Sequence, residues 1–196
     1  MGVTRHHRGG PVLVSGSLLV ITGPPGAGKS AVAVHLARSF DRSVLVAGDD
    51  FFAFLRSGRI EPWLAESDEQ NDTVTDAAAA ATGAFVRGGY DTVYDGILGP
   101  WFIDRFVATL GVAQVDYAVL LPDVEVCVER VATRKDHGFS DESATRHMHQ
   151  QFARADLADR HRITGEDLAG DAASVAQHVL SHRAAGDLRL RRHPRD

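Results

Sequence analysis

The sequence predicts an α/β protein: a three-layer α/β/α sandwich around a five-stranded parallel sheet. Three observations carry this prediction. Apolar, strand-like runs alternate with helical segments along the chain. The stretch 23–30, GPPGAGKS, fits the phosphate-binding loop pattern G-x-x-x-x-G-K-[ST] directly after the first run. Acidic residues follow the next apolar runs, at the edge where parallel strands bring their carboxyl ends together.

The elements follow from the apolar patterning. The expected strands lie at 12–22, 44–47, 92–94, 118–121 and, with a shorter pattern, 161–164. The expected helices lie at about 29–39, 50–57, 68–88, 100–110, 123–135, 140–159 and 171–183. This alternation implies parallel pairing through right-handed crossovers, which places the ligand cleft at the carboxyl ends of the strands.

Size and charge define one domain of a globular protein. The 196 residues contain 44% hydrophobic and 24% charged residues. We expect an N-terminal arm at 1–11, one P-loop domain at 12–183 and a solvated basic tail at 184–196. The net charge of −5 argues against general attraction to nucleic acid or membrane surfaces.

The cysteine content and the N-terminus bear on the compartment. The single cysteine, Cys127, lies in an apolar stretch and is expected to be a buried thiol in a protein without internal disulfides. Arg5 and Arg8 precede an apolar run, as in a signal peptide, but the run ends in the phosphate-binding loop rather than in a cleavage site. We therefore expect a cytoplasmic protein.

The phosphate-binding loop defines the expected nucleotide site. Its glycines let successive backbone N–H groups face one anion, and the following helix adds the partial positive charge of its N-terminus. Lys29 would neutralise the β- and γ-phosphates of ATP, and the Ser30 hydroxyl would be one ligand of Mg²⁺. The expected nucleotide-binding residues are Gly23, Pro24, Pro25, Gly26, Ala27, Gly28, Lys29, Ser30 and Ala31. The competing interpretation is a glycine-rich turn before an ordinary helix.

Acidic residues at the strand ends have two interpretations each. Asp95 ends a short apolar run, as in a Walker B element, and would hold Mg²⁺ beside Ser30; alternatively, it belongs to an Asp-Gly turn. Asp49 and Asp50 follow the second apolar run. One of them fits an N-cap or first-turn charge, while the other is able to accept the proton of an attacking hydroxyl.

Two arginines mark an expected lid. Arg130 and Arg134 are four residues apart on one helical face and precede a polar, glycine-containing break, which predicts a mobile lid at about 134–145. The alternative is a solvated helix face that pairs with Glu125 and Glu129. Residues expected to shape an acceptor pocket are Arg56, Arg59, Glu61, Trp63, Glu66, Gln70, Asn71, Trp101 and Arg105, although both tryptophans also suit core or lid packing.

With these residues placed, the chain resembles the small P-loop kinases of nucleoside-monophosphate-kinase-like fold. Within them it is most similar to the chloramphenicol phosphotransferase-like and zeta-toxin-like phosphotransferases, over about residues 12–183. The resemblance implies a P-loop NTPase fold with a mobile lid. It also implies that Asp50 is the catalytic base, that Asp95 is the strand-three acid, and that Arg130 flanks the adenine while Arg134 reaches the phosphates. The double-acid pattern also occurs in polynucleotide 5′-kinases, and the choice between Asp49 and Asp50 stays open.

The expected function is that of a kinase that uses ATP and Mg²⁺ to phosphorylate a hydroxyl of a small-molecule acceptor. Lys29 and Arg134 would balance the charge on the transferred group, and Asp50 would orient and deprotonate the acceptor. A nucleic-acid 5′-hydroxyl kinase is one alternative, disfavoured by the acidic charge balance. A non-catalytic nucleotide-binding regulatory module is another, and the sequence does not specify an acceptor or an oligomeric state.

Overall fold

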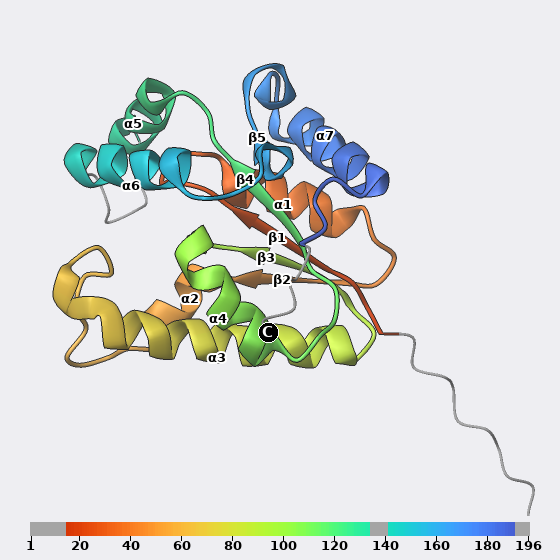
Figure 1. Ribbon diagram of the computed structural model, residues 1–196, viewed down its shortest axis with the longest axis horizontal. Coiled ribbons are helices and arrows are strands. Elements are labelled where there is room, and N and C mark those ends of the chain that lie inside the picture. The colour runs from red at the N-terminus through yellow and green to blue at the C-terminus, as the bar shows by residue number, and fades with distance from the viewer. Residues whose placement is uncertain (1–14, 134–140, 191–196) are drawn as a thin grey trace, which may run out of the picture.

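The computed structural model describes residues 15–133 and 141–190, and the fold is built on five parallel strands (Figure 1). The strands are β1 (Leu18–Thr22), β2 (Ser43–Ala47), β3 (Asp91–Asp95), β4 (Asp116–Leu120) and β5 (Arg162–Ile163). Their order in the sheet is β2-β3-β1-β4-β5, and every pairing is parallel. β1 therefore lies at the centre, and the loop that follows it opens between the ends of β3 and β4.

Helices cover both faces of the sheet and the end where the strands finish (Figure 1). α1 (Lys29–Arg38) and α7 (Ala172–Ala185) pack together on one face, while α2 (Gly48–Ala53), α3 (Asp68–Arg87) and α4 (Pro100–Leu110) lie on the other. α5 (Val124–Thr133) and α6 (Glu142–Arg154) pack against each other near the carboxyl ends of the strands. Short 3₁₀ turns are η1 (Ala65–Ser67), η2 (Asp159–His161) and η3 (Gly165–Leu168). The three-layer α/β/α arrangement with a five-stranded parallel sheet is thus confirmed.

The central strand supplies both hydrophobic cores. Leu18 and Val20 point into the core beneath α3 and α4, whereas Leu19 and Ile21 point into the core beneath α1 and α7. All four are at most 1% exposed. Because side chains alternate across a strand, a run that is apolar at every position is buried on both faces, as expected for a central parallel strand.

Two predicted elements are shorter than the pattern suggested: the first strand begins later and one helix ends earlier. The first strand begins at Leu18, and residues 1–14, which include the predicted arm, lie outside the described residues. The helix expected to reach 159 ends at Arg154. The Arg162 guanidinium donates to the carbonyl oxygens of Ala155 and Leu157, at 2.7 and 2.6 Å, and so takes up acceptors that another helical turn would have used.

The expectation of a solvated tail from residue 184 is wrong for residues 187–190, which are buried or half-buried, whereas residues 184–186 are exposed. α7 continues to Ala185 and ends in a left-handed Gly186. Leu188 is fully buried, and its carbonyl accepts from the Tyr117 N–H at 2.8 Å beside β4. Arg189 donates to Asp116 at 2.8 Å. One buried leucine and one buried carboxylate hold this segment on the sheet, whereas residues 191–196 lie outside the described part of the chain.

Within residues 15–133 and 141–190, no helix has both the length and the apolar character that crossing a bilayer requires.

Candidate active site

The phosphate-binding loop has the backbone geometry that its glycines were expected to permit. Gly23, Gly26 and Gly28 have φ values of 143°, 78° and 92°. A Cβ on Gly26 would lie 2.2 Å from the carbonyl oxygen of Cys127, and a Cβ on Gly23 would lie 2.2 Å from that of Leu120. The loop is therefore pressed against the β4–α5 connection, and a side chain at either position would displace it.

The loop leads directly into α1, which begins at Lys29. No described side chain caps the first turn of α1, and that turn contains no acidic residue. Its N–H groups and its partial positive charge are thus directed at whatever occupies the loop. The Lys29 Nζ donates to the carbonyl of Pro24 at 3.0 Å, which holds the ammonium group over the loop, and Ser30 follows in the exposed first turn.

A cavity of about 230 Å³ lies beside the loop and is called the base cavity below. Its lining residues are Ala27, Gly28, Ala31, Val32, Pro122, Arg130, Leu168, Gly170, Asp171, Ala172 and Val175. Three segments form it: the loop with α1, the β4–α5 region, and the segment from η3 into α7. The walls are small or apolar except for Arg130 and Asp171, which suits a flat ring beside the phosphate site.

Arg130 joins the base cavity to the loop. Its Nη1 donates to the carbonyl of Gly26 at 3.3 Å, and the same atom would lie 3.5 Å from a Cβ on Gly28. The structure therefore places this arginine against the loop, where the sequence predicted a lid arginine. Arg134 and residues 135–140 of the predicted lid lie outside the described residues.

The second strand and the third strand bring their acids to the same edge. Ala47 of β2 is in register with Asp95 of β3, and Asp95 is in register with Ile21 of β1. Asp95 is 8% exposed, whereas Asp49 and Asp50 are exposed in the first turn of α2. The predicted convergence of carboxylates beside the phosphate-binding loop is present.

Tyr94 lies beneath the start of α2, beside two of these acids. A Cβ on Gly48 would lie 2.4 Å from the Tyr94 hydroxyl oxygen, so the start of α2 sits directly over this ring. Burial, and then the charges of Asp49 and Asp95, raise the pKa of Tyr94 above its usual value. The charges of Asp49 and Asp95 therefore both act on this buried hydroxyl.

Cys127 supports the loop from behind and is fully buried, as expected. Burial raises the pKa of its thiol to about 11, against the opposing charges of Lys29 and Arg130. A thiol with this pKa is almost wholly protonated at neutral pH, so Cys127 is a packing residue rather than a nucleophile.

Two residues of the predicted acceptor pocket, Gln70 and Asn71, hydrogen-bond to the segment that precedes α3. Gln70 exchanges two hydrogen bonds with the backbone of Ile60, at 2.8 and 2.7 Å. Asn71 donates to the carbonyl of Pro62 at 2.7 Å and to the Ser67 hydroxyl at 2.9 Å. Both side chains shape the β2–α3 connection from within.

Arg105 is the clearest departure from the predicted pocket. It binds Asp72 at 2.7 Å and Asp76 at 2.6 Å, and these ion pairs join α4 to the solvent-facing side of α3. The sequence prediction failed here because the partners lie about thirty residues earlier, on a helix whose rotation the pattern alone did not define.

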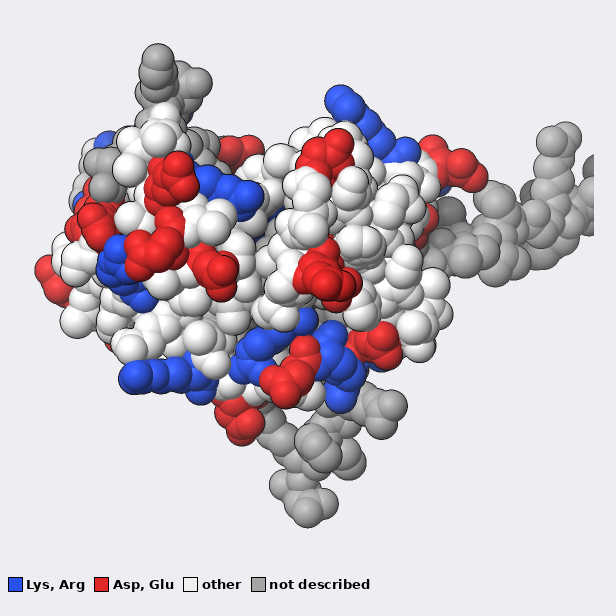
Figure 2. Space-filling view, turned by 90° about the horizontal axis from the view of Figure 1, so that it is seen from above, with Lys and Arg blue, Asp and Glu red and all other residues white. Residues whose placement is uncertain are grey.

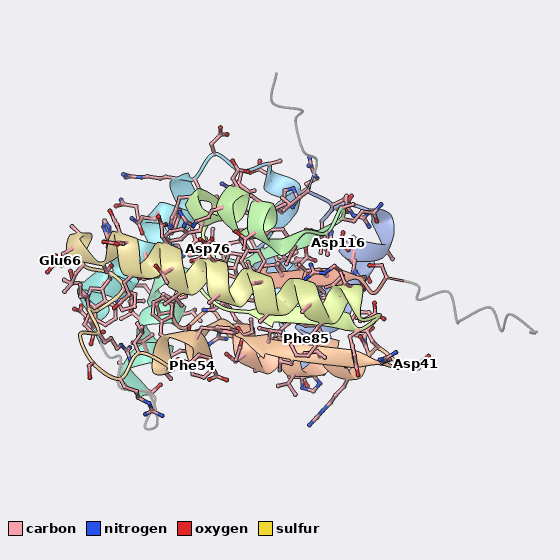
Figure 3. The ribbon with its side chains drawn as sticks, turned by 90° about the horizontal axis from the view of Figure 1, so that it is seen from below. Asp41, Phe54, Glu66, Asp76, Phe85 and Asp116 are labelled. Atoms are coloured by element: carbon pink, nitrogen blue, oxygen red, sulfur yellow. The ribbon has the colours of Figure 1, made fainter. Side chains whose placement is uncertain are left out.

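Three aromatic side chains, which lie at the end of α2, in the α2–α3 connection and on α4, are exposed. Phe54, Trp63 and Trp101 are 70%, 41% and 45% exposed. Figure 3 shows Phe54 and Glu66 toward one end of α3, with Asp41 and Asp116 toward the other. Trp101 packs on Phe152 of α6 with ring centroids 5.2 Å apart. This contact holds the partly exposed indole ring in place.

The wall of the base cavity from Leu168 to Val175 was not among the predicted site residues. Its signal was present in the sequence, since this segment follows the fifth strand and must emerge at the same sheet edge as the other strand ends. Because β5 has only two residues, its apolar pattern was too short to draw attention to the segment that follows it.

The residues present fit a magnesium–nucleotide complex. Ser30 offers a hydroxyl oxygen and Asp95 a carboxylate, and Mg²⁺ takes one or two such ligands together with phosphate oxygens and water. The part of the chain that the structure describes contains no group of three or more His, Cys, Asp or Glu side chains able to hold a metal by themselves. The glycine cradle, the first turn of α1 without a side-chain cap and the base cavity lie next to one another.

The fold and this loop define the class: a small P-loop protein with the α/β architecture of P-loop kinases. The chain belongs to the AAA_33 family, an AAA domain, whose model matches residues 18–156. No curated protein sequence matches the chain.

Several solved structures share the fold. A sugar kinase from Janibacter sp. is 20% identical with a TM-score of 0.67, and the match covers 86% of this chain and 95% of that one. The APS kinase of Mycobacterium tuberculosis is 15% identical with a TM-score of 0.65, covering 87% and 98%. A chain of the Pnkp1/Rnl/Hen1 RNA repair complex is 24% identical with a TM-score of 0.58, covering 71% and 44%. At these identities the likeness shows a shared fold.

Proposed function

We propose that this protein is a kinase that transfers the γ-phosphoryl group of ATP to a hydroxyl of a small-molecule acceptor. The observation that carries the proposal is the meeting, at one sheet edge, of a glycine cradle, the acid that ends β3 and the double acid of α2 that follows β2. The AAA_33 family and the kinases that share the fold support it.

In this proposal the loop holds the phosphates and the base cavity holds the adenine. The backbone N–H groups of the non-proline residues in the loop 23–30 and the N-terminus of α1 bind the β- and γ-phosphates, with Lys29 adding a full positive charge. Arg130 borders the ring in the base cavity. Ser30 and Asp95 would hold Mg²⁺, which supplies charge neutralisation at the phosphate oxygens.

The acceptor reacts at the end of the cleft marked by the double acid. The acceptor oxygen attacks the γ-phosphorus, its proton passes to the Asp50 carboxylate, and the bond from the γ-phosphorus to the β-bridging oxygen breaks to release ADP. Arg134 is proposed to stabilise the transferred group during this step. Asp49, which lies close to Tyr94, is assigned the supporting position of first-turn charge on α2.

The charge distribution favours a small acceptor over a nucleic acid. Figure 2 shows acidic and basic side chains interspersed over the face that carries α5, α6 and α7, without a continuous basic stripe. The net charge of the chain is −5. Nucleic-acid binding sites usually concentrate positive charge along the path of the phosphates.

The test is an acceptor screen with γ-labelled ATP and Mg²⁺ against antibiotics, nucleosides, sugars, nucleotide sugars and a 5′-hydroxyl oligonucleotide. Label is expected in one small-molecule class. Label only in the oligonucleotide would shift the function to end-healing of nucleic acids. Saturable nucleotide binding without transfer to any acceptor, and without hydrolysis, would instead indicate a regulatory module.

The base assignment has a matched pair of variants. Asp50→Asn is expected to lower kcat by about 10²- to 10⁴-fold and to leave the dissociation constant for the nucleotide nearly unchanged, since a general base acts on the acceptor. Asp49→Asn, one residue away in the same helical turn, is expected to retain most of kcat. The reverse order of the two losses would assign the base to Asp49.

A further inference from the structure

A histidine outside the site connects the wall of the base cavity to the end of α7. The His182 Nε2 lies 3.1 Å from a carboxylate oxygen of Asp167 in η3, and its Nδ1 lies 3.2 Å from a carboxylate oxygen of Asp187. Asp167 directly precedes Leu168, which lines the base cavity, and Asp187 is anchored by its N–H to the carbonyl of His182 at 3.1 Å.

The geometry of this bridge requires a particular protonation state. A neutral imidazole carries one N–H, so only one ring nitrogen would donate while the other would direct a lone pair at a carboxylate. An imidazolium donates from both nitrogens and satisfies both acids. Two carboxylates at hydrogen-bond distance on opposite sides of one ring therefore favour the charged form.

We propose that the His182 imidazolium positions the wall of the base cavity. It joins η3 to α7 and so fixes Leu168 and Gly170, which line this cavity. This inference rests on the proposed function, which makes that cavity the site of the adenine. His178, one helical turn earlier, fastens the same residue independently, since its Nδ1 donates to the carbonyl of Asp167 at 2.9 Å. The wall thus has one attachment to a backbone carbonyl and one to a pair of carboxylates.

The surrounding charges support this assignment. Partial burial opposes the charged form of His182, but the hydrogen bonds and charges of Asp187 and Asp167 outweigh it and raise its pKa above the usual value. His35, from the packed helix α1, acts on Asp171 at the start of α7. The nearest basic residue on α7, Arg183, is paired with Asp116 at 2.9 Å.

The sign of the pH dependence follows. The imidazolium bridge is complete below the ordinary pKa of histidine, near 6.5, and is lost as the pH rises through the higher pKa of His182 in the folded protein. The side chains of His182 and Asp167 are 33% and 44% exposed, so the coupling is modest and weakens with added salt. We expect the affinity for nucleotide to fall about threefold across this range, the scale of half-exposed ion pairs.

The experiment measures ADP binding by calorimetry from pH 5.5 to 8.5 with the full chain. The variants are His182→Gln, Asp187→Asn, and the control His147→Gln on the exposed surface of α6. Because the terminal phosphate of ADP also titrates near pH 6, the informative quantity is the ratio of variant to wild-type affinity at each pH. In Asp187→Asn the amide is able to donate to a neutral ring, so Asp167 keeps its partner at every pH.

The expected results separate the inference from the proposed function. His182→Gln should bind ADP about threefold more weakly than wild type at pH 5.5 and equally at pH 8.5, His147→Gln should match wild type throughout, and Asp187→Asn should lose most of the excess pH dependence. Nitrogen-15 spectra of the imidazole should show two N–H groups on His182 at pH 6.5. A flat affinity ratio for His182→Gln, or a neutral ring at pH 6.5, overturns the positioning role while nucleotide binding stands. Failure of the wild type to bind ADP at any pH overturns the proposed function, and the positioning role with it.

Discussion

At the scale of single residues, the site depends on glycines at positions where no other residue fits without strain or a steric clash. Gly26 combines a φ of 78° with an approach to Cys127 so close that a Cβ would lie 2.2 Å from a carbonyl oxygen. Gly186 has nearly the same backbone conformation, with a φ of 82°, but open space around it. The two positions therefore separate the cost of a left-handed backbone from the cost of displacing the loop.

Gly26→Ala is expected to abolish detectable nucleotide binding, whereas Gly186→Ala is expected to retain it. Gly186→Ala should lose about 1–2 kcal/mol in the free energy of unfolding, because it places a side chain in the left-handed region. Gly26→Ala should lose more, because its Cβ would also displace the loop from Cys127. Urea denaturation and calorimetry with ADP measure the two effects. Normal nucleotide affinity in Gly26→Ala would show that the loop does not cradle phosphate.

At the scale of elements, the start of α4 links the third strand to α6. Gly99 precedes Pro100, the first residue of the helix, and the Trp101 ring folds back over it, so that a Cβ on Gly99 would lie 2.3 Å from a ring atom. The other side of the indole meets the fully buried Phe152 of α6. Leu98 is fixed from both sides, since its N–H donates to Thr22 at 2.9 Å and its carbonyl accepts from Tyr117 at 2.7 Å.

Gly99→Ala is expected to push the indole away from Phe152 and to destabilise the protein by about 1–3 kcal/mol, as overpacking of a formed contact does. In a Trp63→Phe background Trp101 is the only tryptophan, so its fluorescence reports the displacement directly. Unchanged emission and an unchanged denaturation midpoint would contradict the packing described for this turn.

The elements also show what the sequence was able to predict. The fixed positions of the loop, Gly23 to Ser30, and the acids after β2 and β3 were found because local chemistry and parallel topology both point to them. The partners of Arg105 and Gln70 were not predicted, because helix rotation and loop path set them and no local pattern encodes either. The same reason explains the tail, where the burial of Leu188 depends on a vacant position beside β4 rather than on its own charged surroundings.

At the scale of the whole molecule, the two ends of the sheet differ: one carries the candidate site and the other an ion-pair network. The carboxyl ends carry the site, whereas the opposite end is held by a buried carboxylate, Asp116, which is 3% exposed and binds both Arg183 and Arg189. Arg183 also donates to Ser17 at 2.6 Å, and Ser17 in turn bonds to Asp91 at the start of β3. This network joins β1, β3 and β4 to α7 and to Arg189, just beyond it.

Asp116→Asn is expected to destabilise the protein by about 3–5 kcal/mol, because it leaves two arginines without their buried charge partner. Asp72→Asn, which weakens an exposed pair with Arg105, should cost less than about 1 kcal/mol. Urea denaturation compares the two. Since Asp116 lies at the far end from Phe54 in Figure 3, its variant should keep the nucleotide affinity of the wild type wherever it is folded.

The most direct test of the account is calorimetry of the magnesium complex of a non-hydrolysable ATP analogue with the wild type, Lys29→Ala and Asp50→Asn. We predict one saturable site in the wild type, retained in Asp50→Asn and lost in Lys29→Ala, because the lysine holds phosphate and the aspartate acts on the acceptor. No binding heat in the wild type, or equal affinity in Lys29→Ala, would contradict the assignment of residues 23–30 as the phosphate site.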